Sequence, residues 1–343
     1  MFQVTRARMQ EILRDFEVPG QLREMMELQR YHYERDNPDS REVRLIVKAE
    51  MEDAAPLVVR FKNEEDVTQA LIESQCCFAQ KLKDHGIETP RQYRCGGSYA
   101  KNYCIGGYEV TVTVEEFVSG EVKLVDVDLA RKTGAVLARM HNIAQQQDLH
   151  VENQVLFDPF THNDLFAFDV FLRLGEALRG EDRALFDRIT DKYTEYMQAL
   201  LPLKNQPRYA VQGDISQCNL YVTEDGRVGV FDFNRSGDNV LFCDAAMQAI
   251  FEARLMDYTE KGEDLEARLL EAFWAGYCAE RPVSEEQWRW YGYLKAIIDA
   301  FWSGDIRWDE GSLLNAQAAG DDAAVSSWLK TIWQRLAGPE SDL

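Results

Sequence analysis

The chain has 343 residues, of which 45% are hydrophobic, so it can bury a large core and is long enough for two lobes. Its formal net charge is −21, and its pI is near 4.7. Such an acidic surface repels the phosphates of nucleic acids and anionic membranes, so we expect neither as a partner, whereas it would attract a cation.

The cysteines and the N-terminal segment both indicate a cytoplasmic protein. Seven cysteines, an odd number without C-x-x-C spacing, indicate reduced thiols. Residues 1–8 mix charges with apolar residues, so no signal peptide is expected, and no membrane span is visible. We expect the protein to act as a monomer or a homodimer.

The beginning of the chain predicts helices followed by two strands. Residues 5–33 place Leu and Met at helical spacings, with an interruption at Pro19-Gly20, so helices are expected on both sides of it. Residues 43–49 alternate between apolar and polar side chains, and residues 57–61 return as a second strand. No glycine-rich loop is present in this region.

A helix and a long strand should come next. The helix is expected from Glu64 to about His85, where Gly86 ends it. Residues 107–120 read as a strand that leads into a connector, and from Asp126 onward the pattern is mainly helical.

A hairpin in the second half carries the strongest chemical signal. Residues 209–211 read as a strand that runs into a loop with Asp214, and Asn219 opens a second apolar strand. An Asp-Gly turn at 225–226 returns the chain through a partner strand that ends at Asp232. The three side chains converge at one edge, where hard Mg²⁺ ions and a hydroxyl nucleophile could be held together. The alternative is a plain hairpin, because Asp and Asn favour turns for reasons unrelated to catalysis.

This spacing resembles the D-x-x-x-x-N loop of protein kinases, which supplies a base and a metal ligand, followed by the metal-binding Asp of D-F-G. More of the chain is similar to the superfamily of aminoglycoside phosphotransferases, choline kinase and type II homoserine kinase. The superfamily's H-G-D-x-x-x-x-N matches residues 212–219, and its following D-F matches residues 232–233. Its L-A-x-L-H helix resembles Leu137–His141, and its G-D-P-x-x-D-L-A stretch resembles residues 237–246.

The resemblance implies an α+β, two-lobed protein-kinase-like fold. Residues 1–117 would form a small antiparallel-sheet lobe that binds the nucleotide, and residues 118–343 a mostly helical lobe that holds the catalytic residues and the acceptor. The implied activity is transfer of the γ-phosphoryl group of ATP, or GTP, to a hydroxyl of a metabolite or an aminoglycoside-like acceptor. Asp214 would accept or orient the hydroxyl proton, and Asn219 and Asp232 would bind Mg²⁺.

The resemblance also implies a phosphate-binding cation in the first lobe. The superfamily's V-L-R or V-L-K strand matches Val58-Val-Arg-Phe, which makes Arg60 the expected cation. Lys62 and Lys48 are competitors, and Lys62 shares a strand face with Arg60. The helix acid expected to pair with the cation is Glu73, the nearest carboxylate, although Gln75 falls on the usual position.

The resemblance further implies that the connector holds adenine through backbone atoms, and Glu116, Phe117 and Val118 occupy this position. The side chains of Glu115 and Glu116 are interpreted as solvated. Because backbone atoms make such contacts, the side chains at these positions carry little information.

Two departures from the related sequences affect the catalytic region. Gln212 stands where the superfamily usually has His, and Asn234 stands where protein kinases have the Gly of D-F-G. Gln212 can donate and accept hydrogen bonds but cannot titrate, so we expect it to set loop geometry. Asp244 is expected to brace the catalytic loop. A catalytically weak nucleotide-binding regulator is one alternative function, and a Ser/Thr protein kinase is another, disfavoured because no A-P-E element follows Asp232.

The resemblance implies that the acceptor is a small molecule with a hydroxyl group, and a cationic one would suit the acidic surface. Residues 158–164 precede an aromatic-rich helix, in an insertion that often forms the acceptor pocket in the superfamily. His162, Asp164 and Asp169 could contact an amine there. Helix capping by Asp164 and surface exposure of the other two are the alternatives. The motifs alone do not choose among acceptors.

Overall fold

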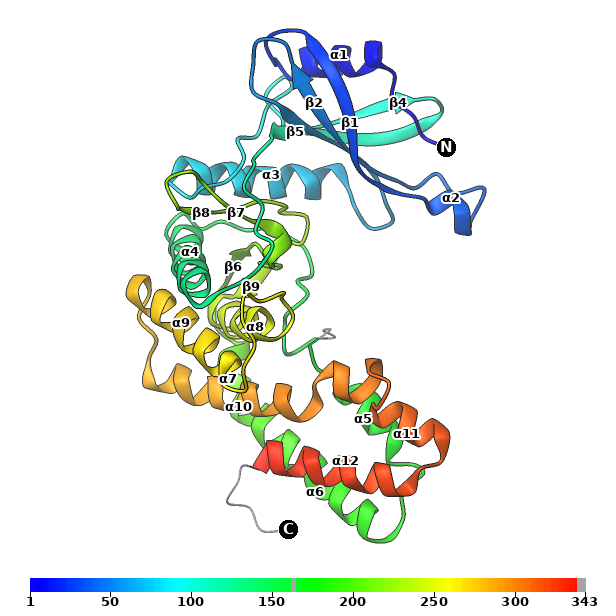
Figure 1. Ribbon diagram of the computed structural model, residues 1–343, viewed down its shortest axis with the longest axis vertical. Helices are drawn as coiled ribbons and strands as arrows, with labels where there is room; N and C mark the ends of the chain where they lie inside the picture. Colours follow the sequence, from blue (N-terminus) through cyan, green and yellow to red (C-terminus); the bar gives the residue numbers. More distant parts are fainter. Residues whose placement is uncertain (162–164, 338–343) are drawn as a thin grey trace.

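The computed structural model describes residues 1–161 and 165–337 of the chain. A sheet lobe lies at one end of the molecule and a larger helical part at the other (Figure 1). Within the described residues, no helix has both the length and the apolar character that crossing a membrane requires.

Five antiparallel strands form the sheet of the first lobe, in the order β1-β2-β3-β5-β4. They are β1 (Leu22–Tyr31), β2 (Val43–Met51), β3 (Leu57–Asn63), β4 (Ala100–Ile105) and β5 (Tyr108–Glu116). One face of the sheet packs its apolar side chains against helix α1 (Arg6–Asp15). Because side chains alternate along a strand, polar residues of β3 and β5 lie on the other face, toward α3 (Gln69–Asp84).

The prediction of a second helix before residue 33 is wrong, because Leu22–Tyr31 forms the edge strand β1. Its residues are mostly good helix formers, such as Leu, Met, Glu and Gln. Pairing with β2, from Leu22 opposite Met51 to Tyr31 opposite Arg44, overrides that local preference. The short helix α2 (Tyr33–Asp36) lies in the loop between these two strands.

Helix α3 also starts later than predicted, at Gln69 instead of Glu64. The Thr68 side chain accepts a hydrogen bond from the backbone N–H of Leu71 and so caps the helix at this point.

The second lobe is built around α4 (Val127–Gln146) and α9 (Leu265–Glu280), which pack closely along each other. A side chain at Gly134 would collide with the carbonyl of Phe273, and one at Gly276 with the carbonyl of Arg131. Other α-helices in the described part of this lobe are α5 (Phe168–Leu174), α6 (Gly180–Ala199), α7 (Leu201–Lys204), α8 (Leu241–Arg254), α10 (Glu285–Phe301), α11 (Leu313–Ala319) and α12 (Asp322–Ala337), and a short π-helix covers Gly304–Trp308.

Two small strand pairs lie on the side of the helical lobe that faces the sheet lobe (Figure 1). Strand β6 (Arg208–Val211) pairs with β9 (Gly237–Val240), and β7 (Leu220–Val222) pairs with β8 (Val228–Val230). The second pair is the hairpin expected from the sequence. The backbone N–H of Val230 donates to the carbonyl of Glu88, at 2.8 Å, which ties this hairpin to the segment after α3.

Candidate active site

The structure brings Asp214, Asn219 and Asp232 into one cleft between the lobes. Asp214 follows β6, Asn219 ends a short 3₁₀ turn before β7, and Asp232 follows β8. The Asn219 side-chain amide donates to the backbone carbonyl of Asp214 at 2.8 Å and to its carboxylate at 3.2 Å. The loop and the hairpin therefore place the three oxygen-bearing side chains together, as the sequence predicts.

Gln212 connects the two loops that carry the carboxylates. Its side chain is fully buried. Its Nε2 donates to the carbonyl of Asp232 at 2.8 Å, and its Oε1 accepts from the backbone N–H of Asp214 at 2.7 Å. A side chain at the adjacent Gly213, where φ is +83°, would collide with the carbonyl of Arg235. These contacts confirm the expectation that Gln212 sets loop geometry.

The two carboxylates of the site have different electrostatic surroundings. Burial raises the pKa of Asp214 to about 6, and the charge of Asp232 acts in the same direction. Burial also raises the pKa of Asp232, but Arg60 and Lys62 outweigh it and hold that pKa below its ordinary value. Environments that separate two carboxylate pKa values in this way assign them different roles. Because its pKa is lowered, Asp232 stays ionised and is suited to bind a cation. Because its pKa is raised, Asp214 is suited to accept and release a proton.

The backbone at Asp232 is unusual, because its φ is +58°, in the left-handed region that residues with a Cβ rarely adopt. Backbone outliers of this kind cluster at functional sites, where the surrounding structure fixes them. Here, the hydrogen bond from Gln212 to the Asp232 carbonyl is one such fixing contact.

The donor set suits a hard cation that completes its coordination with ligand oxygens. Over residues 1–161 and 165–337, no group of three or more His, Cys, Asp and Glu side chains could hold a metal ion by itself. Asn219 and Asp232 offer oxygen ligands only, which fits Mg²⁺, since this ion is usually held by one or two carboxylates together with phosphates and water.

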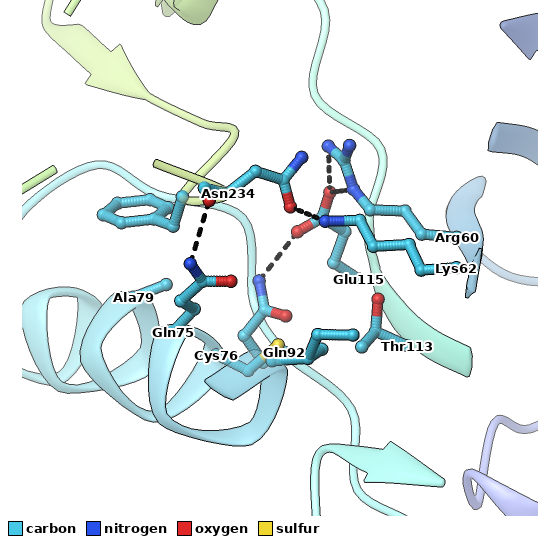
Figure 2. Close-up of a pocket in the computed structure, with 11 residues that line it drawn as sticks. Arg60, Lys62, Gln75, Cys76, Ala79, Gln92, Thr113, Glu115 and Asn234 are labelled. Carbon is cyan, nitrogen blue, oxygen red and sulfur yellow. Dashed lines mark hydrogen bonds and ion pairs between the residues drawn. The ribbon is translucent and has the colours of Figure 1, made fainter. Parts of the chain in front are cut away.

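Arg60 and Lys62 of β3 both point into a pocket between the sheet and α3 (Figure 2). Each side chain is almost completely buried. The Nη1 atom of Arg60 lies 3.6 Å from Oδ2 of Asp232, and Nζ of Lys62 hydrogen-bonds the side chain of Asn234. Both cations therefore lie beside the loop that carries Asp232.

Lys48, the third candidate, lies elsewhere on the sheet. Its Nζ is 4.1 Å from the centre of the Phe117 ring and 2.6 Å from the carboxylate of Glu50. Lys48 is thus next to the connector between the lobes, whereas Arg60 and Lys62 are next to the carboxylates.

The carboxylate beside Arg60 comes from β5, not from α3. Glu115 accepts hydrogen bonds from Arg60, and it is only 8% exposed, so the interpretation of Glu115 as solvated is wrong. Glu73, expected to pair with the cation, instead accepts from the backbone N–H groups of Tyr99 and Ala100, each at 2.7 Å. Glu115 falls on the same strand face as the pocket-lining Thr113, but the alternation of the strand does not by itself say which residue of β5 meets Arg60, because that depends on the register between the strands.

The connector begins with two backbone N–H groups that are already used. That of Glu116 donates to Arg91, and that of Phe117 donates to Pro56, each at 2.9 Å. The backbone hydrogen bonds found across the described residues include none from the N–H of Val118. Of the three predicted connector residues, Val118 is thus the one whose N–H has no backbone acceptor among the described residues.

Asp244 lies deeper in the helical lobe. Its carboxylate is 3.0 Å from Nε2 of His141, whose Nδ1 is 3.0 Å from the hydroxyl of Tyr277. All three side chains are buried, and they join α8, α4 and α9. The side-chain hydrogen bond of Asp244 therefore joins helices in the core, and none in the described part of the chain links it to the catalytic loop that it was expected to brace.

One residue of the predicted acceptor insertion can be placed. Asp169 is exposed and lies 3.8 Å from Arg173, one turn further along α5. His162 and Asp164 lie outside the described residues, so the proposed contact of these side chains with an acceptor remains a prediction.

Solved structures with the same fold include three kinases or phosphotransferases. Amicoumacin kinase, in a complex with AMP-PNP and Ca²⁺, is 15% identical with a TM-score of 0.55, over 95% of this chain and 93% of that one. A microcompartment-associated aminopropanol kinase is 14% identical with a TM-score of 0.55, over 95% of each chain. An aminoglycoside phosphotransferase from Alicyclobacillus acidocaldarius is 14% identical with a TM-score of 0.51, over 91% and 93%. These similarities confirm the predicted two-lobed α+β fold.

Comparison with curated protein sequences finds no match. The sequence model of the phosphotransferase enzyme family, in contrast, matches residues 8–291. This match spans both the sheet lobe and the loops with Asp214 and Asp232. The chain therefore belongs to the phosphotransferase enzyme family.

Proposed function

We propose that this protein is a small-molecule kinase that transfers the γ-phosphoryl group of ATP to a hydroxyl group of its acceptor. The observation that carries the proposal is the meeting of Asp214, Asn219 and Asp232 in one cleft, on loops joined by Gln212. The chain's family supports it. AMP-PNP in the amicoumacin kinase complex favours ATP over GTP as the donor.

In this proposal the sheet lobe binds the nucleotide. Arg60 and Lys62 hold phosphate oxygens, because their charges lie next to Asp232 and a guanidinium can bind two oxygens at once. The N–H of Val118 and the carbonyl of Glu116 hold the adenine. Phosphoryl transfer depends mainly on such positioning and on charge neutralisation.

The helical lobe would supply the groups that act at the reacting atoms. Asn219 and Asp232 hold Mg²⁺, which would neutralise charge on the phosphate oxygens when bound. Asp214 orients the acceptor hydroxyl and takes its proton, a role that suits a carboxyl whose pKa is raised to about 6.

The acceptor we propose is a small molecule that carries an amine as well as a hydroxyl. Glu65 and Asp66 line the same cleft as Asp214 and would attract a cation, whereas Glu64 is already paired with Arg44 there. The similar structures include an aminopropanol kinase and an aminoglycoside phosphotransferase, which agrees with such an acceptor. We place this reaction in the cytoplasm, where ATP and small metabolites meet.

The test is a panel of hydroxyl acceptors incubated with the protein, ATP and Mg²⁺, with ADP release as the readout. The panel should contain amino alcohols, choline, aminoglycosides and neutral sugars, each compared with the rate without acceptor. We expect at least one amine-bearing acceptor to raise the rate, and Asp214→Asn to reduce that increase by about 10²-fold or more. Binding of ATP without ADP release for any acceptor would instead identify a nucleotide-binding regulator.

A further inference from the structure

A buried ion pair joins two neighbouring strands of the sheet lobe. Nε and Nη2 of Arg60 lie 3.0 and 2.9 Å from the same carboxylate oxygen of Glu115. The second oxygen of Glu115 accepts from Nε2 of Gln92 at 2.9 Å. Figure 2 shows these contacts converging on one carboxylate. Both oxygens of Glu115 are therefore occupied, and the orientation of its side chain is fixed.

The register of the sheet makes this pair possible. Arg60 lies opposite Thr113 and Val58 lies opposite Glu115, so Arg60 and Glu115 are diagonal neighbours on one face. Long side chains reach across such a diagonal in an antiparallel sheet. The two residues are 9% and 8% exposed, so solvent weakens their attraction little.

The other end of the guanidinium is ion-paired with Asp232 but forms no hydrogen bond within the described part of the chain. Among the described side chains, Nη1 of Arg60 is buried without a hydrogen-bond partner. It lies 3.6 Å from Oδ2 of Asp232, too far for a hydrogen bond but on the side of the proposed metal site. A buried donor left without an acceptor destabilises a protein unless a ligand supplies one. A phosphate oxygen beside Asp232 would be such an acceptor.

Helix α3 has other contacts. Glu73 binds the backbone at the start of β4, and the neutral Gln75 donates to the carbonyls of Asn234 and Ser236, at 2.9 and 3.4 Å. The α3 residues that line the pocket of Arg60 are Ile72, Gln75, Cys76 and Ala79, and none of them is a carboxylate. Helix α3 thus holds the loop after Asp232 but does not hold the cation.

We infer that Glu115 is the positioning residue that aims the Nη1 end of the Arg60 guanidinium at the nucleotide phosphates, in place of a carboxylate from α3. This inference rests on the proposed function. In protein kinases, the corresponding ion pair forms only when its helix is in place, which allows the helix to switch activity. Here both partners belong to adjacent, hydrogen-bonded strands, so the cation is oriented whatever the position of α3.

The test compares the binding of Mg-ATP and of adenosine by isothermal titration calorimetry, for the wild type, Glu115→Gln and Glu73→Gln. Because Glu115 acts through Arg60 on the phosphates, Glu115→Gln should weaken Mg-ATP binding about tenfold or more and leave adenosine binding unchanged. Glu73→Gln removes the α3 carboxylate and should leave the ratio of the two affinities unchanged. Thermal unfolding of each variant checks that it is folded.

A double-mutant cycle keeps the inference testable if Glu115→Gln alone folds poorly. Arg60→Gln with Glu115→Gln leaves no unpaired charge of this pair, and the double variant should bind Mg-ATP no more weakly than Arg60→Gln alone. The inference would be overturned if the losses of Mg-ATP affinity in Arg60→Gln and Glu115→Gln added up in the double variant. It would also be overturned if Glu115→Gln weakened the binding of Mg-ATP and of adenosine equally, or if Glu73→Gln weakened the binding of Mg-ATP but not of adenosine. If the wild type bound no Mg-ATP, the proposed function would fall together with this inference. If the wild type bound Mg-ATP but Glu115→Gln did not selectively weaken that binding, the inference would be overturned and the proposed function would stand.

Discussion

The buried ammonium of Lys62 should destabilise the nucleotide-free protein, so Lys62→Met is predicted to stabilise it. The side chain is 7% exposed, and burial together with the nearby Arg60 lowers the pKa of Lys62 from 10.5 to about 8. This difference makes the charged form less favourable in the folded protein by roughly 3 kcal/mol. Methionine avoids that cost but loses the hydrogen bond to Asn234. We therefore expect a net gain of about 1–2 kcal/mol at pH 7.

The stability gained in Lys62→Met should depend on pH. Below pH 8 the folded and unfolded chains both carry the proton on Lys62, so the full cost is present. Between pH 8 and 10.5 the folded chain loses this proton first, and the wild type becomes more stable as the pH rises. The stability difference between Lys62→Met and the wild type should therefore shrink across this interval.

Urea unfolding at pH 7 and at pH 10 measures both effects. The matched control is Lys132→Met, which removes an exposed lysine of α4 paired with Asp128, and its stability relative to the wild type should change little between the two pH values. A Lys62→Met protein that is less stable than the wild type at pH 7 would refute the reasoning, as would a gap of the same size at both pH values. Mg-ATP should bind the stabilised variant more weakly, because Lys62 is proposed to hold phosphate.

Substitutions at three further positions test the catalytic loops. Asp232→Ala should abolish turnover and weaken Mg-ATP binding in calorimetry, since it removes a proposed metal ligand, and near wild-type activity would contradict the kinase assignment. Asp214→Asn should lower turnover by about 10²-fold or more with little change in nucleotide affinity, whereas loss of ATP binding would point to a metal or folding role. Gln212→His can keep both loop contacts and should remain active. Gln212→Leu leaves the Asp214 N–H and the Asp232 carbonyl unpaired, so it should lose roughly 1–3 kcal/mol in unfolding experiments. The reverse ranking, with Leu active and His inactive, would mean that Gln212 faces a ligand.

The catalytic loops were predictable because their geometry is local. The strands on either side of the Asp-Gly turn fix where Asn219 and Asp232 emerge, and β6 places Asp214 a few residues earlier. The role of Gln212 in loop geometry was also predictable, because the amide side chain of a residue next to a loop acts mainly by donating and accepting hydrogen bonds.

The contacts between distant segments were not predictable in the same way. The strand β1 exists because of its pairing with β2, which its helix-favouring residues do not signal. The partner of Arg60 depends on the register between β3 and β5, and Glu115 lies 55 residues away in sequence. The choice between Glu73 and Gln75 depends on how α3 is rotated against the sheet, and the helical pattern alone does not specify this.

Transfer of the γ-phosphoryl group to a small molecule is the most direct test of the proposed kinase activity. The protein is incubated with Mg²⁺, ATP labelled in the γ-phosphate and the best acceptor of the panel, and the label is followed into small molecules, inorganic phosphate and protein. We expect label in the small-molecule acceptor with the wild type, and labelling that is slower by about 10²-fold or more with Asp214→Asn. Label found only in inorganic phosphate or only in protein would contradict it.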